Sequence, residues 1–367
     1  MAAAVGVGRF IYTPILPPMV DDLLLSKGEA GLIASANYLG YLAGALVAAS
    51  PRLPGSARGW LLWSLAVSAV TTGAMGLTDR LGDFLLLRFA GGAASAFVLV
   101  LASVLVLERL ASAKRSDLST VHFAGVGGGI VVSALVAWGM VSLGGGWEGM
   151  WFGGGMVALA AVVAVAILVP GVDLDRAAQT STVNPSARPR IWPLVAAYGL
   201  FGFGYVITAI FFVAIIRGSL GTSSLETYIW LVVGLAAIPS VAVWTNLARR
   251  YGVTTVFAIA CVVEALSVVA SVLWVSLPGL FVAAVFFGGT FMGITALGLV
   301  AARTLWVNDS RRALAIMSAA FALGQIVGPV VAGYGFDLTG SSHHLVKVDV
   351  VDLRVFVDVI RQVGLRF

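Results

Sequence analysis

Long apolar segments separated by short polar turns follow one another along most of the chain. Each apolar segment runs for about 18–25 residues, the length that crosses the hydrocarbon core of a bilayer as a helix. Polar and apolar residues do not alternate with the two-residue period of a half-buried strand. The pattern predicts membrane-spanning helices over residues 1–20, 28–49, 60–77, 84–107, 118–142, 147–170, 192–216, 224–247, 252–276, 280–303 and 312–335.

The composition excludes a soluble fold. Hydrophobic residues make up 60% of the chain and charged residues only 11%, against about 25% charged residues in soluble domains. The mean hydropathy is +1.01. Because backbone groups in hydrocarbon must be satisfied within the protein, we expect an all-α integral membrane protein. The 44 glycines suit close packing of helices in lipid. We expect a monomer surrounded by the lipid bilayer.

Lysine and arginine gather in every second loop, which by the positive-inside rule lies in the cytoplasm. We therefore expect the N-terminus and the polar segment 171–191 in the cytoplasm, and the chain in the inner (plasma) membrane of a bacterium. The positive charge needs no nucleic-acid partner, because it belongs to these loops. The residues are Arg52, Arg58, Arg109, Lys114, Arg115, Arg176, Arg188, Arg190, Arg249, Arg250, Arg303, Arg311 and Arg312. The opposite loops carry Lys27, Arg80, Arg88 and Arg217, offset by Asp21, Asp22, Glu29, Asp79, Asp83, Glu148 and Glu226, and we expect Arg88 to mark a membrane interface.

The parts of the chain on either side of segment 171–191 repeat each other. When the sequence is shifted by 196–197 residues, Gly6–Ile11 falls on Gly202–Ile207, and the pair Gly91-Gly92 falls on Gly288-Gly289. Parallel six-span repeats occur in transporters that hold their substrate between the halves near the bilayer midplane. We predict a first half over 1–170, a cytoplasmic linker over 171–191 and a second half over 192–335.

Both ends depart from this repeat. Span 1 has five residues before Gly6, whereas its counterpart has about ten before Gly202, so we expect that the chain begins downstream of an original start. The counterpart of span 147–170 would contain several charged residues that each cost about 2.5–3.5 kcal/mol at the bilayer centre. We therefore expect the twelfth span to be missing or replaced, with 336–367 a non-spanning polar tail outside. The charged residues are Lys347, Asp349, Asp352, Arg354, Asp358 and Arg361.

Four segments carry a resemblance to a known family: Gly8–Met19, Val121–Gly127, Gly288–Leu297 and Gly324–Pro329. On these residues the chain resembles the YbfB/YjiJ-type branch of the major facilitator superfamily, over about residues 5–342 and with atypical ends. The resemblance implies two six-helix halves, here with about eleven spans. One departure is the loop after span 2, which keeps only Arg52 and Arg58 of the usual Asp-Arg-x-Gly-Arg motif.

The resemblance implies a secondary active transporter that moves a small molecule by alternating access with proton coupling. The alternative is a non-transporting or degenerate member of the fold that acts as a membrane sensor or structural protein, which the atypical ends would suit. We found no Walker lysine, no assembled Ser/His/Asp set and no metal-ligand cluster in the sequence. We therefore expect no enzymatic activity, no cofactor and no metal.

Arg9 is the most informative candidate, because a cation at bilayer depth costs about 3 kcal/mol on insertion scales and usually has a partner or ligand. Arg9, Tyr12 and Thr13 lie at i, i+3 and i+4, which predicts one helical face. Since span 1 lines the central cavity of the resembled fold, Arg9 would bind an anionic substrate or exchange internal partners between states. Alternatively, the short first span lets Arg9 reach the cytoplasmic surface.

The remaining candidates for substrate contact are polar residues in other cavity-lining spans. Tyr205 occupies the position equivalent to Arg9 in the repeat, and Tyr38 and Tyr41 lie close to Asn37 in span 2. For each candidate the alternative is a hydrogen bond that joins two helices. The candidates are Asn37, Tyr205, Thr208, Thr290 and Gln325.

Two residues are candidates for proton coupling. Glu264 is the only acidic residue deep within a predicted span, and a buried carboxyl can take up and release a proton under physiological conditions. The resemblance, however, places its span at the periphery, where a bond to a neighbouring helix explains it equally well. His122 titrates near neutral pH and could relay protons, or it could hold a structural hydrogen bond.

Overall fold

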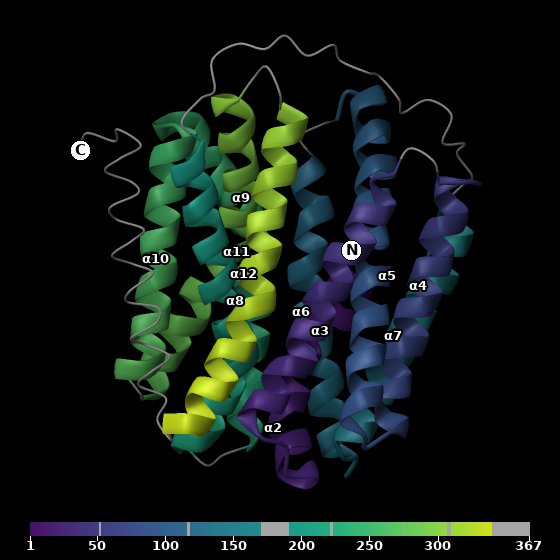
Figure 1. Ribbon diagram of the computed structural model, residues 1–367, viewed down its shortest axis with the longest axis vertical. Helices are drawn as coiled ribbons and strands as arrows, with labels where there is room; N and C mark the ends of the chain where they lie inside the picture. Colours follow the sequence, from purple (N-terminus) through teal and green to yellow (C-terminus); the bar gives the residue numbers. More distant parts are fainter. Residues whose placement is uncertain are drawn as a thin grey trace.

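The computed structural model describes residues 1–50, 53–115, 118–169, 191–220, 223–274, 276–306 and 310–339 (Figure 1). Within these ranges, 11 helices are long and apolar enough to cross a membrane and no strand occurs, which confirms the all-α fold. Most of the expected linker and nearly all of the expected tail, including the position of a twelfth span, lie outside the described residues.

The helices follow the predicted spans with small shifts at their ends. The first span consists of a π-helical turn and two α-helical pieces that continue one another. The elements are η1 (Ala2–Val7), α1 (Gly8–Phe10), α2 (Tyr12–Leu23), α3 (Lys27–Ala48), α4 (Ala57–Ala74), η2 (Met75–Leu77), α5 (Leu81–Ser112), α6 (Ser119–Ser142), α7 (Trp147–Leu168), α8 (Trp192–Leu220), α9 (Ser223–Tyr251), α10 (Val253–Leu273), α11 (Leu277–Leu305) and α12 (Ser310–Thr339).

The internal repeat is visible in the helix boundaries. The helices α3 and α9 begin 196 residues apart, and so do α4 and α10, and α5 and α11. One close contact repeats with the same offset. A Cβ at Gly92 would lie 1.9 Å from the carbonyl oxygen of Asn37, and a Cβ at Gly288 would lie 2.2 Å from that of Val233. Glycine is therefore required at both positions for the backbones to approach.

The helices of the two repeats meet along three pairs. In Figure 1 the helices α2–α7, purple to blue-green, occupy the right side of the view, and α8–α12, teal to yellow, occupy the left. Helix α3 packs against α12, α6 against α9, and α2 against α8. Span 1 and its counterpart α8 therefore contact each other directly, as the parallel repeat predicts.

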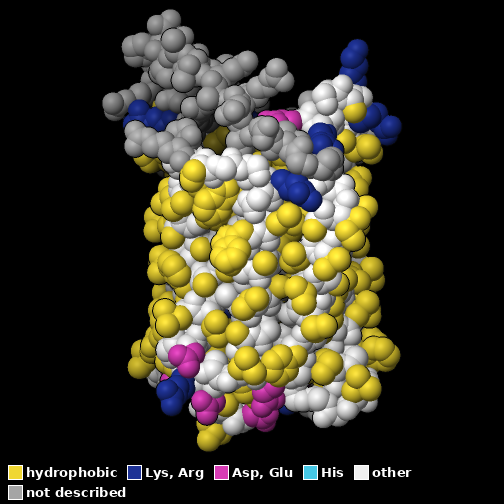
Figure 2. All heavy atoms as spheres, turned by 90° about the vertical axis from the view of Figure 1, so that its right-hand side faces the viewer, with side chains coloured by type: hydrophobic (Ala, Val, Ile, Leu, Met, Phe, Trp, Pro, Cys, Tyr) yellow, Lys and Arg dark blue, Asp and Glu magenta, His cyan; other side chains and the backbone are white. Residues whose placement is uncertain are grey.

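The charges divide between the two ends of the bundle. We call the end at which α7 ends and α8 begins the linker end, and the other the far end. Figure 2 shows Lys and Arg side chains at the upper, linker end, and Asp and Glu mainly at the lower, far end. From this charge distribution, the positive-inside rule predicts that the linker end faces the cytoplasm.

Candidate substrate site

Arg9 is buried within the first half of the bundle, with a residue exposure of 8%. Its guanidinium lies over the ring of Tyr41 at 4.3 Å and near that of Tyr38 at 5.2 Å. Its Nη2 donates a long hydrogen bond of 3.5 Å to Ser95 Oγ in α5. The alternative interpretation expected the short first span to bring Arg9 to the surface, whereas Arg9 is buried.

The Nε of Arg9 has no hydrogen-bond partner among the described residues. In the same part of the chain, no carboxylate lies within 4.0 Å of its guanidinium. Cation–π contacts with two tyrosines stabilise the charge, and Tyr41 also lies within hydrogen-bond reach of Arg9, but the Nε–H among the five N–H donors of the arginine stays unused within the described ranges. Arg9 thus combines charge, burial and an unused donor.

Arg88 is a second buried cation, and our sequence interpretation placed it wrongly. We counted it with the loops and the membrane interface, whereas only 4% of it is exposed. Its Nη1 donates to the carbonyl of Gly8 at 2.9 Å, and its Nη2 to the carbonyl of Arg9 at 3.4 Å. The rings of Tyr12 and Trp151 lie 5.1 Å and 5.8 Å from it. Arg88 holds α5 against the backbone of α1.

Arg9, Tyr12 and Thr13 do not converge on one place, although their spacing predicts a shared face. The Tyr12 hydroxyl donates to the carbonyl of Ala30 in α3 at 2.9 Å. The Thr13 hydroxyl donates to the carbonyl of Ala209 in α8 at 2.6 Å. The three side chains thus donate their hydrogen bonds to three different helices, α5, α3 and α8, and Tyr12 and Thr13 satisfy their hydroxyls on protein backbone.

Tyr205 and Gln325 face this region from the second half. The Gln325 Nε2 donates to the Tyr205 hydroxyl at 2.5 Å. The Oε1 of Gln325 has no hydrogen-bond partner within the described ranges, although the residue is 0% exposed. Tyr38 of α3 lies within hydrogen-bond reach of Tyr205. We call Arg9, Tyr38, Tyr41, Tyr205 and Gln325 the central cluster, since it joins both halves.

A ladder of aromatic rings supports the central cluster on the side of the second half. The ring of Tyr205 stacks between those of Phe291 and Phe321, with interplanar angles of 6° and 2° and centroid distances of 5.9 Å and 5.6 Å. Phe201 stacks on Tyr205 as well. Offset parallel stacking of this kind stabilises ring orientation beyond simple burial. It therefore fixes the direction in which the Tyr205 hydroxyl points.

Asn37 and Thr208 are buried within the helix packing near the cluster. The Asn37 Nδ2 donates to the carbonyl of Arg88 at 3.0 Å and so joins α3 to α5, while its Oδ1 is without a partner in the described part of the chain. Thr208 lies in α8 one turn after Tyr205 and is 5% exposed. Substrate contact by either residue stays a prediction.

Thr290 and Glu264 form a pair of their own, away from the central cluster. The Thr290 hydroxyl contacts a carboxylate oxygen of Glu264 in a short hydrogen bond between α11 and α10. Both residues are buried. His122 lies between α6 and α5, where its Nε2 is 3.1 Å from Ser103 Oγ. Each of these two contacts joins helices of the same half, and a role in coupling stays a prediction for Glu264 and His122.

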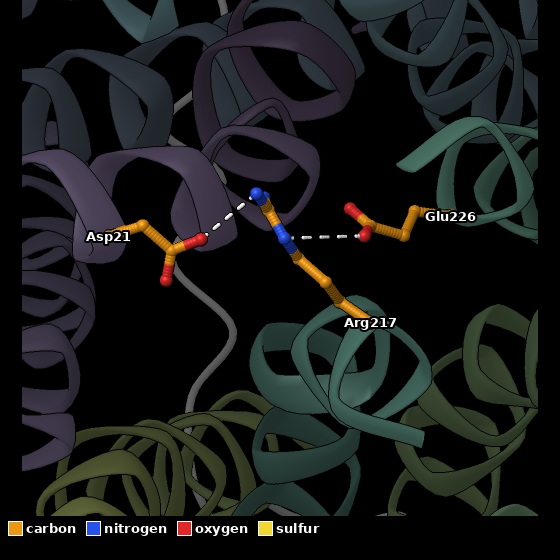
Figure 3. A network of polar contacts seen from close by, with 3 residues as sticks. All are labelled: Asp21, Arg217 and Glu226. Carbon is orange, nitrogen blue, oxygen red and sulfur yellow. Dashed lines mark ion pairs between the residues drawn. The ribbon is translucent and has the colours of Figure 1, made fainter. Parts of the chain in front are cut away.

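The far end contains polar contacts that the sequence did not indicate. Figure 3 shows Arg217 of α8 reaching between Asp21 of α2 and Glu226 of α9. Its Nη2 lies 2.9 Å from the Asp21 carboxylate, and its Nε lies 3.7 Å from that of Glu226. The side chain of Glu226 is only 6% exposed, although the sequence placed it in a loop.

Asp337 makes a second contact between the halves at this end. Its carboxylate accepts hydrogen bonds from the backbone amides of Lys27 and Gly28 at 3.0 Å and 2.7 Å. These amides belong to the first turn of α3, where an anion is favoured by the unpaired N–H groups and the helix dipole. Helix α12 thus extends to Thr339, four residues beyond the predicted end of its span. We call these two sets of contacts the far-end contacts.

The chain is similar to a known protein family and to a curated relative. The family described as "Uncharacterised MFS-type transporter YbfB" matches residues 1–356. The match continues past Ser342, where our resemblance ended. A curated relative from Bacillus subtilis (strain 168), the uncharacterized MFS-type transporter YceJ, is 28% identical over 216 residues. That segment covers 54% of this chain and about half, 52%, of the relative.

Solved structures with a similar fold are transporters. The nucleoside transporter NupG aligns with a TM-score of 0.73 and 13% identity, over 100% of this chain and 98% of its own. A bacterial homologue of the human lysosomal transporter Spinster, in an inward-facing and unoccupied conformation, aligns with a TM-score of 0.62 and 14% identity, over 98% and 91% of the two chains. At these identities the similarity shows the fold alone, which is that of the major facilitator superfamily.

Proposed function

Because the chain belongs to the family of YbfB-type major facilitator transporters, we propose that it is a secondary active transporter that moves a small molecule by alternating access. The substrate would bind at the central cluster, to which Arg9 contributes from the first half and Tyr205 and Gln325 from the second. A site made by both halves is required if their relative motion is to expose the substrate to each side in turn.

The observation that carries this proposal is the arrangement of the far-end contacts. They join α2 to α8 and α12 to α3, so each connects the first half with the second. They are hydrogen bonds and ion pairs at or near the surface, and such contacts exchange readily with water. This favours a state closed at the far end by interactions weak enough to open during a transport cycle.

We further propose that a proton gradient drives transport, with Glu264 as the first candidate for the proton carrier. A carboxyl that is buried in a span and bound to the Thr290 hydroxyl can exist in two protonation states with different hydrogen-bond roles, as acceptor or as donor. Protonation would therefore change how α10 packs against α11.

Uptake into proteoliposomes tests the proposal. The full chain is reconstituted, a panel of labelled carboxylates, amines and neutral metabolites is supplied, and uptake is followed with and without an imposed pH gradient. We expect one chemical class to accumulate against its concentration gradient only when the pH gradient is present. No uptake of any class would favour the alternative, a non-transporting member of the fold.

Movement of the halves is tested independently of the substrate. Thr13 is buried at the contact of α2 with α8, so a Thr13→Cys variant in a Cys261→Ala background reports opening of the far end. In right-side-out and inverted vesicles, labelling by an impermeant maleimide from the far-end side should increase when Arg217→Gln and Asp337→Ala are added. Leu77→Cys, exposed at the far end, is the control and should be labelled equally in both backgrounds. Unchanged labelling of Thr13→Cys would contradict the gating role.

A further inference from the structure

The charges inside the bundle indicate which class of substrate fits the central cluster. Arg9 and Arg88 are both buried in the first half, and among the described residues neither has a carboxylate within ion-pair distance. The two buried acids of the second half are already engaged, Glu226 with Arg217 and Glu264 with Thr290. The first half therefore holds an excess of positive charge in a low-dielectric environment, which an anion would neutralise.

The two arginines differ in which of their hydrogen-bond donors are available to a ligand. Arg88 uses both terminal nitrogens on the carbonyls of Gly8 and Arg9 and leaves only its Nε without a partner in the described part of the chain, so it mainly holds the backbone. Arg9 makes one long hydrogen bond to Ser95, lies within hydrogen-bond reach of Tyr41 and rests on the rings of Tyr38 and Tyr41, and its Nε is without a partner among the described residues. An adjacent pair of N–H groups on one side of a guanidinium is the geometry that binds a carboxylate with two parallel hydrogen bonds.

The second half contains a buried hydrogen-bond acceptor that lacks a donor among the described residues. Gln325 uses its amide nitrogen on the Tyr205 hydroxyl, and its buried Oε1 accepts no hydrogen bond from any residue that the structure describes. A buried acceptor without a partner is unfavourable, and an O–H or N–H group of a ligand would satisfy it. Arg9 and Gln325 are connected through Tyr38 and Tyr205, so one small molecule lying along this tyrosine pair would reach both.

The stacked aromatic rings indicate that the part of the ligand between its two polar groups is a flat ring. The rings of Tyr205, Phe291 and Phe321 are nearly parallel to one another, and Phe321 is only partly buried. Flat rings bind best to another flat apolar surface in an offset stack. Tyr38 and Tyr41 add aromatic surface on the side of the first half.

Resting on the transport function proposed above, we infer that the substrate is a small aromatic carboxylate with a hydroxyl or amino donor on the ring. The carboxylate would bind Arg9, the donor would bind Gln325 Oε1, and the ring would lie against Tyr38 and the edge of the Tyr205 ring, whose two faces Phe291 and Phe321 cover. The committed guanidinium of Arg88 would add favourable charge without direct contact.

Binding to the purified full-length chain tests this inference with four matched probes. 4-Hydroxybenzoate carries all three features, benzoate lacks the donor, 4-hydroxybenzyl alcohol lacks the charge, and inorganic phosphate lacks the ring. Thermal stabilisation and isothermal calorimetry should rank 4-hydroxybenzoate first. We expect it to bind roughly tenfold more tightly than each of the others, the size of effect that one well-placed hydrogen bond or charge provides. Preference for the alcohol or for phosphate would overturn the inference.

Two variants assign the contacts. Gln325→Leu should lower the affinity for 4-hydroxybenzoate to that of benzoate and leave the affinity for benzoate unchanged, whereas equal losses for both probes would contradict the role of Oε1. Arg9→Lys keeps the charge but loses the paired N–H groups, and it should weaken both carboxylates about equally. Thr245→Val, whose hydroxyl bonds only to its own helix, is the control and should change neither.

Failure of this inference is distinguishable from failure of the proposed function. If none of the probes binds while another class of compound accumulates in proteoliposomes, the substrate class is wrong and the transport function stands. If 4-hydroxybenzoate binds with the expected ranking but nothing is taken up and Thr13→Cys labelling does not respond to the far-end variants, the site is confirmed and the transport function is contradicted.

Discussion

The hydroxyl of Thr13 donates a hydrogen bond to the carbonyl of Ala209, a residue 196 positions further along the chain. That separation equals the offset between the two repeats, so each residue stands at the position equivalent to the other. A contact between equivalent positions lies at the pseudo-twofold axis that relates the halves. This bond therefore joins the two halves at the axis about which, in the proposed transport cycle, one half rotates relative to the other.

Replacement of Thr13 by valine should loosen this link. Valine keeps the shape of threonine but cannot donate, and the loss of one buried hydrogen bond costs about 1 kcal/mol. Because the bond joins the halves, its loss should destabilise mainly the state that is closed at the far end. With Ala209→Cys as the reporter in the Cys261→Ala background, we expect faster labelling from that end, while Thr245→Val, with its bond inside one helix, should leave the labelling rate unchanged. An equal effect of both variants would indicate a general loss of packing.

Arg9 and Arg88 should separate into a residue for binding and a residue for stability. Arg88→Gln removes two charge-assisted hydrogen bonds to the backbone of α1, which should lower the free energy of unfolding by about 3 kcal/mol. Arg9→Gln removes a charge with few hydrogen bonds and should change stability much less while abolishing carboxylate binding. Thermal unfolding in detergent and calorimetry measure the two effects. The reverse assignment of losses would contradict the site.

The ion pairs of Arg217 should show unequal strength. The Asp21 side chain is 58% exposed, so Asp21→Asn should cost less than about 1 kcal/mol. Glu226 is buried, and Arg217→Gln would leave its carboxylate without a countercharge, which should destabilise the protein more. The double variant Arg217→Gln/Glu226→Gln should recover part of that loss. Thermal unfolding of the parent protein, Arg217→Gln, Glu226→Gln and the double variant forms a double-mutant cycle, and strict additivity would show that the pair does not interact.

Asp337 should protect the first turn of α3. Its carboxylate receives two backbone amides, in addition to the capping box of Ser26 and Glu29. Asp337→Ala should therefore accelerate hydrogen exchange at the amides of Lys27 and Gly28 by a factor that corresponds to about 1 kcal/mol. Asp337→Glu, which keeps the charge, is the matched control. Exchange that is unaffected by Asp337→Ala would mean that the intrinsic cap suffices.

Glu264 should be required for coupling and not for binding. If it carries the proton, Glu264→Gln should abolish accumulation driven by a pH gradient while substrate exchange across the membrane continues, because glutamine can still bond to the Thr290 hydroxyl. His122→Gln serves as the comparison. Retained accumulation in Glu264→Gln would assign the residue to helix packing alone.

Much of the fold is predictable from the sequence, because the length of apolar segments and the position of basic loops depend on the bilayer and not on tertiary contacts. The spans, the repeat offset and the unusual position of Arg9 all follow from these patterns. The direction of Tyr12 and Thr13 does not, since both are set by the carbonyls that neighbouring helices place within reach.

Arg88 illustrates a signal that was present and misread. It lies near one end of its predicted span, which suggested the membrane interface, yet Arg88, Gly92 and Ser95 fall at i, i+4 and i+7 on one helical face. Gly92 contacts α3 and Ser95 accepts the bond from Arg9, so that face points inward. Asp337 gave no comparable signal, because its partners Lys27 and Gly28 lie on a helix far away in the sequence. Glu226 pairs with Arg217 on the preceding helix, and no periodic pattern within α9 indicates that pairing.

If the halves alternate as proposed, Arg9 and Arg88, which have no carboxylate partner among the described residues, would also make the protein responsive to voltage. Moving one elementary charge through a potential of 100 mV changes its energy by about 2.3 kcal/mol, and a charge that moves through a fraction of the field experiences that fraction. An inside-negative potential thus favours the empty state in which Arg9 and Arg88 lie nearer the cytoplasm. A bound anion weakens that preference, so the return of the empty carrier is the step whose rate should depend most on membrane potential.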